Sequence, residues 1–504
     1  MAGICLNEDD SHFYVTRTAE EMDEEHVDAL VDTYAGTQVR ELLFCPNAMR
    51  TSYASAVWPA IWDGYDPEAG DDQPFLQSAG SEMRRWPHNA WLLNHQGIDP
   101  YQRWLARSRT LNISPWLSMR MNDVHCVDNL NSPLVTEFWR KHQEYWRVPW
   151  RFDSWQHRAF DYGRKEVRDH HMLLVRELVE RYDMDGLELD WMRFGYHFRP
   201  GREEQGRGIL TEFTSQVREL LDRREAELGH PIKLGCRVPS RPQTARALGM
   251  DAVEWARRGL VDMIVVTPFW ATIEFDMPIE LWKELLGETD VILAAGLEVL
   301  LRPFPQPAPA RYCDVEAVRG AAASLLARGA DRIYLFNYMD NPMNNPMASQ
   351  PDENGTYLTK GQYERVLNET GSLETLAGKP RRHVVTYSDT WAPGEPEAAS
   401  LPTRCEKGKT AEFRLHIGPK PQSGKSTVLI GTKEGKSDIE VHVNSSLCPR
   451  VEAHPDDGAR SPAEILHECD VPLKELNPGY NVIEATSRTA DAEIVWVELF
   501  IHER

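Results

Sequence analysis

Two carboxylates separated by one residue, Glu188 and Asp190, have the spacing in this chain that most clearly predicts chemistry. They lie in the stretch from Asp185 to Arg193, where polar and apolar residues alternate. Side chains alternate along a strand, so both carboxylates share one face and two leucines share the other. An amphipathic helix over Lys165 to Tyr182 precedes them, which is typical of a parallel barrel whose strand ends carry the chemistry. Paired carboxylates in that setting suit acid and base catalysis on a sugar.

A third carboxylate, Glu298, follows a later apolar run that ends at Gly296. Glycosyl transfer requires two carboxyl groups, one protonated to release the leaving group and one ionised as a nucleophile or as a base for water. We predict Asp190 and Glu298 as the catalytic pair, on strand ends that face each other across a barrel mouth. Glu188, one layer deeper, is predicted to tune Asp190, since a nearby like charge raises a pKa. Two alternatives stay open: Asp190 in an ion pair inside the barrel, and Glu298 on a solvated loop.

A second polar stripe predicts substrate contacts. Between Ser114 and His125, the residues Ser118, Arg120 and Asn122 alternate with apolar ones, and a polar stripe at the end of a barrel strand is the expected place for substrate. The alternative for Arg120 is an ion pair with Glu188, because buried charges must be paired. Several arginines hint at a sulfated or uronic-acid glycan, since guanidinium groups bind such anions bidentately. The predicted substrate-binding residues are Arg120, Asn122, Asp123, His125, Arg193, Arg237, Trp270 and Asn337.

The elements that position these residues recur as βα units between about residues 39 and 340. Short apolar runs alternate with helical segments there, which favours the α/β class and a (β/α)8 TIM barrel over an open sheet. The predicted strands are Val39 to Cys45, Ile113 to Asn122, Arg158 to Tyr162, Asp185 to Asp190, Ile232 to Val238, Val261 to Thr267, Val291 to Gly296 and Arg332 to Asn337.

Two long insertions follow the first two predicted strands, from Asn47 to about Trp91 and from Asp123 to about Gln156. Both are rich in tryptophan and tyrosine. Loops after barrel strands build the active-site face, and aromatic planes there suit stacking on sugar rings. The alternative is that these tryptophans pack the insertions.

The character of the chain changes after Gly378. Residues 390–397 have the composition of a connector, and short alternating runs with turn signals such as Asn477 to Asn481 follow them. This pattern predicts a C-terminal all-β sandwich. We therefore predict a catalytic barrel over residues 1–378 and an accessory sandwich over 379–504, which either binds carbohydrate or braces the barrel.

Composition narrows the class of partner. The chain has 504 residues and is 41% hydrophobic, which allows a large core and more than one domain. A formal charge of −22 disfavours nucleic acid and anionic membrane surfaces as partners. No apolar stretch approaches the ~20 residues of a membrane helix. The N-terminus has no secretory signal, so we expect a cytoplasmic protein, or a periplasmic or secreted one if a signal peptide was removed.

The cysteine pattern and the other motifs do not indicate a cofactor or a metal site. Eight cysteines are widely spaced without a CxxC pair, which favours buried free thiols over disulfides. The sequence has no Gly-rich phosphate loop, nucleophile elbow or recognisable metal-ligand spacing. We therefore predict no cofactor and no metal, with a carbohydrate as the substrate. The sequence does not predict the oligomeric state.

Two family resemblances support this prediction. The stretch Asp185 to Trp191 resembles the fourth-strand motif DGxDxDxE of the chitinase-like hydrolases, whose catalytic acid is the final glutamate. This chain has Met192 there, which argues against a mechanism assisted by a substrate acetamido group. Over most of its length the chain is more similar to the poorly characterised family 10-like glycosyl hydrolases, in Arg120 to His125, Asp185 to Arg193 and Arg382 to Pro396. That resemblance implies a (β/α)8 barrel and a broad polysaccharide-processing role.

Three hypotheses remain from the sequence. The leading one is a glycoside hydrolase with a two-carboxylate acid/base mechanism. The second is a glycan-binding barrel that lost catalysis, as Met192 permits. The third is a lyase or isomerase acting on a sugar acid. Release of a new reducing end separates the first from the second, and an unsaturated product that absorbs in the ultraviolet indicates a lyase.

Overall fold

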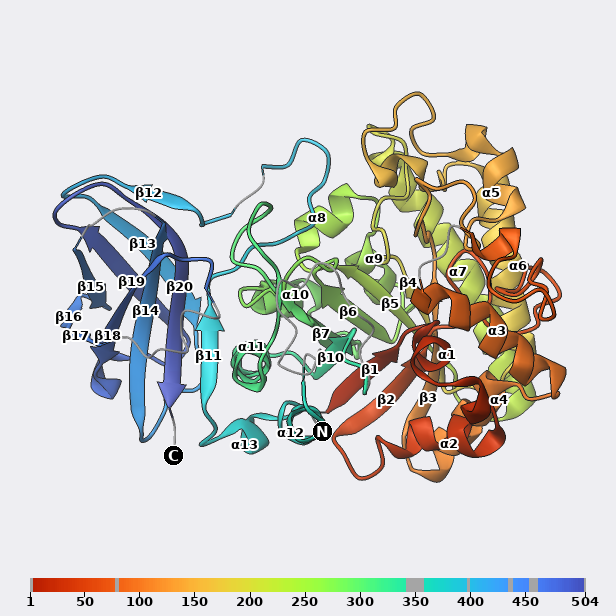
Figure 1. Cartoon of the computed structure of the whole chain (residues 1–504), viewed down its shortest axis with the longest axis horizontal. Coiled ribbons are helices and arrows are strands. Elements are labelled where there is room, and N and C mark those ends of the chain that lie inside the picture. The colour runs from red at the N-terminus through yellow and green to blue at the C-terminus, as the bar shows by residue number, and fades with distance from the viewer. Residues whose placement is uncertain are drawn as a thin grey trace.

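The structure is a computed structural model that describes residues 3–77, 81–340, 358–396, 399–433, 438–452 and 461–502. Eight parallel strands close into a barrel in the order β1-β10-β7-β6-β5-β4-β3-β2. The predicted (β/α)8 barrel is therefore confirmed, with the barrel on the right of Figure 1 and the sandwich on the left. The barrel strands are β1 (Ile4–Glu8), β2 (Val39–Phe44), β3 (Ser114–Arg120), β4 (Gly186–Asp190), β5 (Lys233–Pro239), β6 (Met263–Thr267), β7 (Ile292–Glu298) and β10 (Arg332–Phe336).

One predicted strand is wrong, and the strand that opens the barrel has no predicted counterpart. The segment Arg158 to Tyr162 is not a strand: Trp155–Arg158 form a 3-10 helix, and Phe160 makes an isolated bridge to Trp146. The first barrel strand is instead β1, which pairs with β2 and β10. Its five residues are all buried, so no polar alternation marks it. Because one predicted strand is absent and one strand was not predicted, β4 is the fourth barrel strand both in the prediction and in the structure.

Helices surround the barrel on the outside (Figure 1). The predicted helix before β4 is confirmed as α6, and the helix before β10 ends next to Gly329, whose φ of 109° suits glycine. The helices are α1 (His12–Thr16), η1 (Ala19–Glu21), α2 (Glu24–Asp32), η2 (Pro74–Leu76), α3 (Ser81–His95), α4 (Pro100–Thr110), α5 (Glu137–Lys141), η3 (Gln143–Tyr145), η4 (Trp155–Arg158), α6 (Lys165–Arg181), α7 (Glu203–Leu228), α8 (Pro242–Ala247), α9 (Ala252–Arg257), α10 (Ile279–Leu286), α11 (Val315–Ala327), α12 (Lys360–Glu369), α13 (Leu373–Leu376) and η6 (Leu473–Glu475).

The barrel interior changes from apolar to polar along the strands. Near the strand beginnings, Trp116 lies so close to Gly186 that a Cβ there would come within 2.3 Å of the indole, so the position requires glycine. Further along, β3 and β4 pair Ser118 with Glu188, and β4 and β5 pair Asp190 with Arg237. Tyr334 on β10 donates to Glu188 although β10 and β4 are not neighbours in the sheet. The polar faces of β3 and β4 therefore point into the barrel.

The C-terminal part is a sandwich of two antiparallel sheets with its own apolar core. The predicted all-β domain is therefore confirmed, whereas the division at residue 378 stays a prediction. One sheet has the order β11-β20-β14-β18-β17 with β12 on β20, and the other has the order β13-β19-β15-β16. The strands are β11 (Arg381–Val384), β12 (Thr403–Cys405), β13 (Thr410–His416), β14 (Lys425–Lys433), β15 (Ile439–Val443), β16 (Ser446–Cys448), β17 (Arg450–Val451), β18 (Ile465–Val471), β19 (Tyr480–Ser487) and β20 (Ala492–His502); outside both sheets, β8 (Leu300–Leu301) pairs with β9 (Arg311–Tyr312).

The sandwich packs directly against helix α11 of the barrel. A Cβ at Gly320 would come within 1.8 Å of the carbonyl oxygen of Arg382 in β11, so the helix approaches the strand at backbone distance. Ser324 on α11 also lies 3.0 Å from His416 of β13. Leu429 and Trp496 of the sandwich join the core cluster of the barrel. The two domains therefore share a packed interface.

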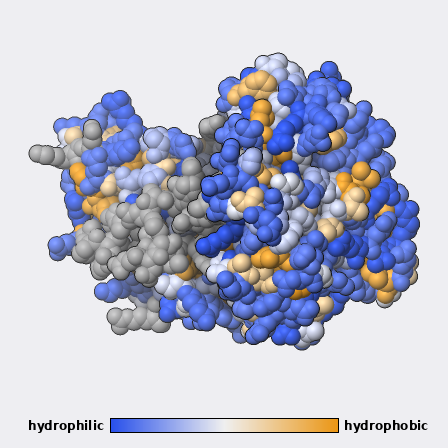
Figure 2. Space-filling view, turned by 45° about the vertical axis from the view of Figure 1, so that its right-hand side comes forward, coloured by the Kyte–Doolittle hydropathy of each residue, from blue (hydrophilic) through white to orange (hydrophobic). Residues whose placement is uncertain are grey.

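The surface is hydrophilic over most of the face in Figure 2, with apolar residues in small separate groups. In the part of the chain that the structure describes, no helix combines the length and apolar character that a membrane crossing requires. All eight cysteines are free thiols; seven of them are buried, as predicted, and Cys126 is exposed.

Candidate active site

Asp190 ends β4 and is 1% exposed. Its Oδ2 accepts a hydrogen bond from Nη1 of Arg237 at 2.9 Å, and its Oδ1 accepts from the backbone N–H groups of Met192 and Arg193 at 3.0 and 2.8 Å. These donors stabilise the charged carboxylate. The ion pair that the sequence left open for Asp190 is therefore present, with Arg237 as its partner.

Glu188 lies one layer deeper in the barrel and is fully buried. Its Oε1 accepts from the hydroxyls of Ser118 at 2.6 Å and Tyr334 at 2.9 Å, while Oε2 has no hydrogen-bond partner in the described part of the chain. Burial, reinforced by the charge of Asp190, raises the pKa of Glu188 to about 7. The like-charge effect predicted for this pair thus acts on Glu188 itself.

Glu298 ends β7 and is also 1% exposed, so the solvated-loop alternative is wrong. Asn337, which follows β10 with a φ of 63°, donates from Nδ2 to both carboxyl oxygens at 3.0 and 3.2 Å. The backbone N–H of Val299 donates to Oε1 at 2.9 Å. Burial raises the pKa of Glu298 to about 8. At neutral pH Glu298 therefore retains a proton, which is the state of a general acid.

Arg237 lies among these acids. Its side chain is fully buried, and its guanidinium lies 3.7 Å from the centroid of the Phe336 ring. Burial lowers the pKa of Arg237, but surrounding acidic groups, Asp190 foremost and Glu188 and Glu298 with it, outweigh burial and raise it. We name Glu188, Asp190, Glu298 and Arg237 the inner cluster.

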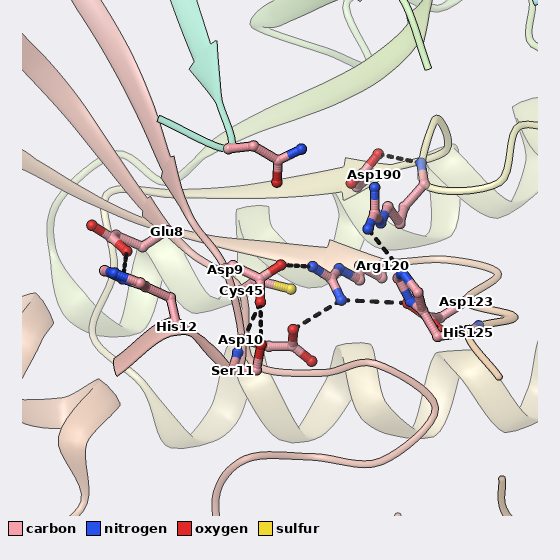
Figure 3. A network of polar contacts seen from close by, with 12 residues as sticks. Glu8, Asp9, Asp10, Ser11, His12, Cys45, Arg120, Asp123, His125 and Asp190 are labelled. Carbon is pink, nitrogen blue, oxygen red and sulfur yellow. Dashed lines mark hydrogen bonds and ion pairs between the residues drawn. The ribbon is translucent and has the colours of Figure 1, made fainter. Parts of the chain in front are cut away.

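A second set of carboxylates meets at the ends of β1 and β3 (Figure 3), and we name it the outer cluster. Arg120 Nη1 lies 2.8 Å from Asp10 Oδ1 and 3.4 Å from Asp123 Oδ2, and Nη2 binds Asp9. All four side chains are almost completely buried. Arg120 is thus an ion-pair partner, as the sequence alternative held, but its partners are these three aspartates and Glu188 is not among them.

The pKa values of the three aspartates in the outer cluster are shifted in opposite directions. Burial opposes the ionisation of Asp9, but Arg120 and the Ser11 hydroxyl together hold the pKa of Asp9 well below its usual range. Burial also opposes the ionisation of Asp123, yet His125 and Arg120 lower its pKa to about 2. Burial raises the pKa of Asp10 well above its usual range despite Arg120. Arg120 therefore contacts two aspartates whose pKa values are lowered and one whose pKa is raised.

His125, which lies beside Asp123 in Figure 3, bridges the two clusters together with Arg193. His125 Nδ1 lies 2.9 Å from Oδ2 of Asp123, and its Nε2 lies 2.8 Å from Nη2 of Arg193. A guanidinium only donates hydrogen bonds, so Nε2 accepts and the proton of a neutral imidazole is on Nδ1. Burial lowers the pKa of His125 despite the charge of Asp123. Since the backbone N–H of Arg193 binds Asp190, the bridge links both sets of carboxylates.

Two other predicted substrate contacts have structural partners. Asn122 is fully buried, and its amide donates to the carbonyl of Phe160 at 3.0 Å and accepts from the same residue's N–H at 2.9 Å, which braces the second insertion. Asn337 orients Glu298, as described above. Trp270 is half-buried in the loop after β6. The roles of Asn122, Asn337 and Trp270 in substrate binding stay predictions.

The tryptophans of the insertions divide between packing and exposure. Trp58, Trp86, Trp139 and Trp146 are buried, which confirms the packing alternative for them. Trp150 is 66% exposed. Of these five insertion tryptophans, four therefore pack inside the protein and Trp150 is exposed.

Several polar residues at the strand ends have no predicted counterpart. Asp9 and Asp10 directly follow β1, and recognising that strand would have found them. His12 is fully buried between Glu8 Oε2 at 2.9 Å and Asp340 Oδ1 at 3.1 Å. Burial lowers the pKa of His12, but its two carboxylate neighbours outweigh burial and raise it to about 9. No group of three or more metal-ligating side chains suited to a metal ion occurs among the described residues.

The fold and these contacts define a (β/α)8 barrel with carboxylate clusters at the C-terminal ends of its strands. No family model matches the chain, and no curated protein does. Similar solved structures include alpha-L-fucosidase isoenzyme 2 from Paenibacillus thiaminolyticus, which is 14% identical over 74% of this chain and 49% of that chain, with a TM-score of 0.42. The glycoside hydrolase domain of PgaB (BpsB) from Bordetella bronchiseptica is 11% identical over 73% and 99%, with a TM-score of 0.40.

A cycloisomaltooligosaccharide glucanotransferase from Paenibacillus sp. is similar over 99% of this chain and 57% of that chain, at 10% identity and a TM-score of 0.34. The present chain thus spans about half the length of the fucosidase and of the glucanotransferase. Similarity at this level does not transfer an activity, so the function has to be argued from the site.

Proposed function

We propose that this protein is a glycoside hydrolase in which Glu298 is the general acid and Asp190 is the charged carboxylate. The supporting observation is that two buried carboxyl groups end strands β7 and β4 with different partners. Neutral donors bind Glu298, whose pKa is raised to about 8, whereas Asp190 is ion-paired with the guanidinium of Arg237. Cleavage of a glycosidic bond requires one protonated and one ionised carboxyl group.

The proposed reaction adds water across the glycosidic bond. Glu298 protonates the glycosidic oxygen, the bond to the anomeric carbon breaks, and the Glu298 carboxylate that forms is stabilised by Asn337 and by the N–H of Val299. If Asp190 is the nucleophile, it forms an ester bond to the anomeric carbon, and Glu298 then takes a proton from the water whose oxygen displaces Asp190. If Asp190 is the base, it takes a proton from the water whose oxygen bonds to the anomeric carbon, and that proton returns to Glu298 through solvent.

The proposed substrate is a carbohydrate, and the guanidinium groups favour one that carries anionic groups. Nε of Arg193, and Nε and Nη2 of Arg237, are buried without a hydrogen-bond partner among the described residues. Buried donors of this kind are costly unless a ligand or water satisfies them. Carboxylate, sulfate or hydroxyl oxygens of a glycan are suitable acceptors.

The test is the release of reducing ends from neutral and anionic polysaccharides and oligosaccharides. Wild type is compared with Asp190→Asn and Glu298→Gln, and Asp491→Asn, in an exposed ion pair of the sandwich, is the control. Loss of activity in both site variants, with folding and the control intact, supports the pair. Activity that survives in either variant removes that residue from its proposed role. Proton NMR of the first anomer formed then distinguishes retention from inversion.

A second candidate function, a glycan-binding barrel without catalysis, has its own supporting observation. Both oxygens of Asp190 are already engaged, by Arg237 and by backbone N–H groups, as in a structural ion pair. Met192, at the position of the chitinase acid, is fully buried. Calorimetric binding of a glycan from the same panel, without any release of reducing ends, would favour this candidate over the hydrolase.

A further inference from the structure

The segment from Thr386 to Glu395, which we name the strap, connects β11 to β12 by an indirect route. In Figure 1 it leaves β11, passes close to α8 of the barrel and returns to the sandwich. Its polar contacts are with the loops that follow β4, β5 and β6. These loops lie at the C-terminal end of the barrel, where the carboxylate clusters also lie.

Asp389 accepts three of these hydrogen bonds from consecutive residues. Its Oδ1 accepts the backbone N–H of Phe269 at 2.7 Å, and its Oδ2 accepts those of Trp270 and Ala271 at 2.8 and 2.7 Å. Burial raises the pKa of Asp389, and the three N–H groups oppose this shift because they stabilise the ionised carboxylate. The backbone of the loop after β6 is therefore held at three consecutive residues by a side chain from the second domain's connector.

The strap is also connected, through Ser240, to a buried acid on the same loop. Ser388 lies 3.5 Å from Oγ of Ser240, and Ser240 donates to Oε2 of Glu274 at 2.6 Å. Glu274 is 2% exposed, and burial raises its pKa to about 7. One residue further along, the N–H of Phe275 donates to Oγ1 of Thr386 at 3.4 Å. The strap thus contacts both ends of the loop from Phe269 to Phe275.

The remaining strap contacts extend to the two preceding loops. The hydroxyl of Tyr196, after β4, donates to the carbonyl of Trp391 at 3.2 Å. The guanidinium of Arg241, after β5, lies 5.1 Å from the centroid of the Trp391 ring, within cation–π range. Glu395 accepts from the hydroxyl of Thr244 in α8 at 2.9 Å. Three successive barrel loops are therefore tied to one segment.

We propose that the strap is part of the active-site face and that Asp389 is a positioning residue, which holds the loop carrying Trp270 in the conformation that binds the glycan. This inference rests on the proposed function. Loops at a barrel mouth are mobile unless their backbone groups are tied, and misplacement of a binding group by about 1 Å can cost about 100-fold in rate. The sandwich, through its connector, then completes the site in addition to bracing the barrel.

The test compares Asp389→Ala with Asp262→Ala in the full chain. Asp262 is a matched control because its carboxylate also accepts a backbone N–H, that of Leu234 at 2.7 Å, but at the opposite ends of β5 and β6. Hydrogen exchange at residues 269–271 should become faster by about tenfold or more in Asp389→Ala alone, since the hydrogen bonds that protect these amides are lost.

The same variants are assayed on the best glycan of the panel. We expect Asp389→Ala to lower kcat/KM by about tenfold, mainly through KM, because it displaces a binding group. The variant Asp389→Asn retains one acceptor oxygen and should recover part of both effects, and it also serves if the alanine variant fails to fold. Asp262→Ala should leave kcat/KM unchanged.

Two results would overturn the inference: unchanged exchange at residues 269–271 in Asp389→Ala, or faster exchange with unchanged kcat/KM. Failure of the proposed function is a different result. If wild type releases no reducing ends, the hydrolase is wrong, but the exchange experiment and the affinity for a bound glycan still decide whether Asp389 positions the loop.

Discussion

The inner and outer clusters each contain several buried carboxyl groups, but the pKa values of these groups are shifted differently in the two clusters. In the inner cluster, Arg237 pairs with Asp190, while neutral donors surround Glu188 and Glu298, whose pKa values are raised to about 7 and about 8. In the outer cluster, Arg120 contacts three aspartates at once, and the pKa values of two of them are lowered.

Depth of burial does not explain this difference, because both clusters are buried. The partners that oppose burial explain it. Burial raises the pKa values of Glu188 and Glu298 more than their hydrogen-bond donors lower them. At Asp9 and Asp123, Arg120 acts together with Ser11 or His125 and outweighs burial, whereas at Asp10 it does not. The inner cluster is therefore suited to proton transfer, and the outer cluster to a fixed charge that shapes the site.

The largest expected effect is on kcat, and it distinguishes the inner cluster from the outer cluster. We expect Glu298→Gln to lower kcat by about 10²–10⁴-fold, the usual contribution of general acid catalysis. Asp123→Asn in the outer cluster should change kcat by less than about tenfold and act mainly on KM. Steady-state kinetics on the same glycan measures both. The opposite ranking would place the acid in the outer cluster and reverse the comparison.

The next effect concerns stability. We expect Arg120→Met to cost about 3–5 kcal/mol of unfolding free energy, because it leaves buried aspartate charges without their cation. Urea denaturation followed by circular dichroism measures this. Arg404→Met is the control, since it breaks an exposed pair with Asp491 and should leave the midpoint unchanged. A small loss at Arg120 would show that water reaches the outer cluster.

The inner cluster was the easier of the two to predict from the sequence. Strand alternation placed Glu188 and Asp190 on one face, and the apolar run of β7 led to Glu298, because the period of a strand is a local property. Strand alternation did not predict the ion-pair partners of these residues. That Arg120 binds aspartates instead of Glu188 depends on which strand ends meet across the barrel.

The outer cluster was not predicted, because its prediction required strand β1, which the sequence pattern does not mark. β1 is short and buried on both faces, so its five residues show no alternation. Asp9 and Asp10 could therefore not be assigned to the end of a strand. Asp389 is more distant still, because it lies 119 positions from Trp270 and their contact exists only after the two domains have docked. No local pattern carries that information.

A third prediction uses the raised pKa values of the inner cluster. The folded-state pKa of Glu298 is about 8 against an ordinary value of 4.5, so between these values the folded protein binds a proton that the unfolded chain has lost. Unfolding then releases a proton, and stability is complete below pH 4.5 and decreases as pH rises to 8, by up to about 1.4 kcal/mol per pH unit for one group.

Urea midpoints from pH 5 to 9 measure this slope for wild type and for Glu298→Gln. The glutamine variant should be flatter, because its amide does not titrate. His12, whose pKa is raised to about 9, contributes a slope of the same sign between 6.5 and 9 and should remain in the variant. A slope equal to that of wild type would mean that Glu298 is already ionised at neutral pH.

The smallest effect tests whether the clusters are coupled at all. Removing His125 deletes one hydrogen bond to Asp123 and one from Arg193, and a single such bond contributes about 1 kcal/mol net. In a double-mutant cycle of His125→Ala and Arg193→Met, we expect a coupling free energy of about 0.5–1 kcal/mol. A coupling of zero would make the clusters independent. The bridge would then serve only to hold the loops after β3 and β4, and the protonation of the inner cluster would not respond to charge changes around Arg120.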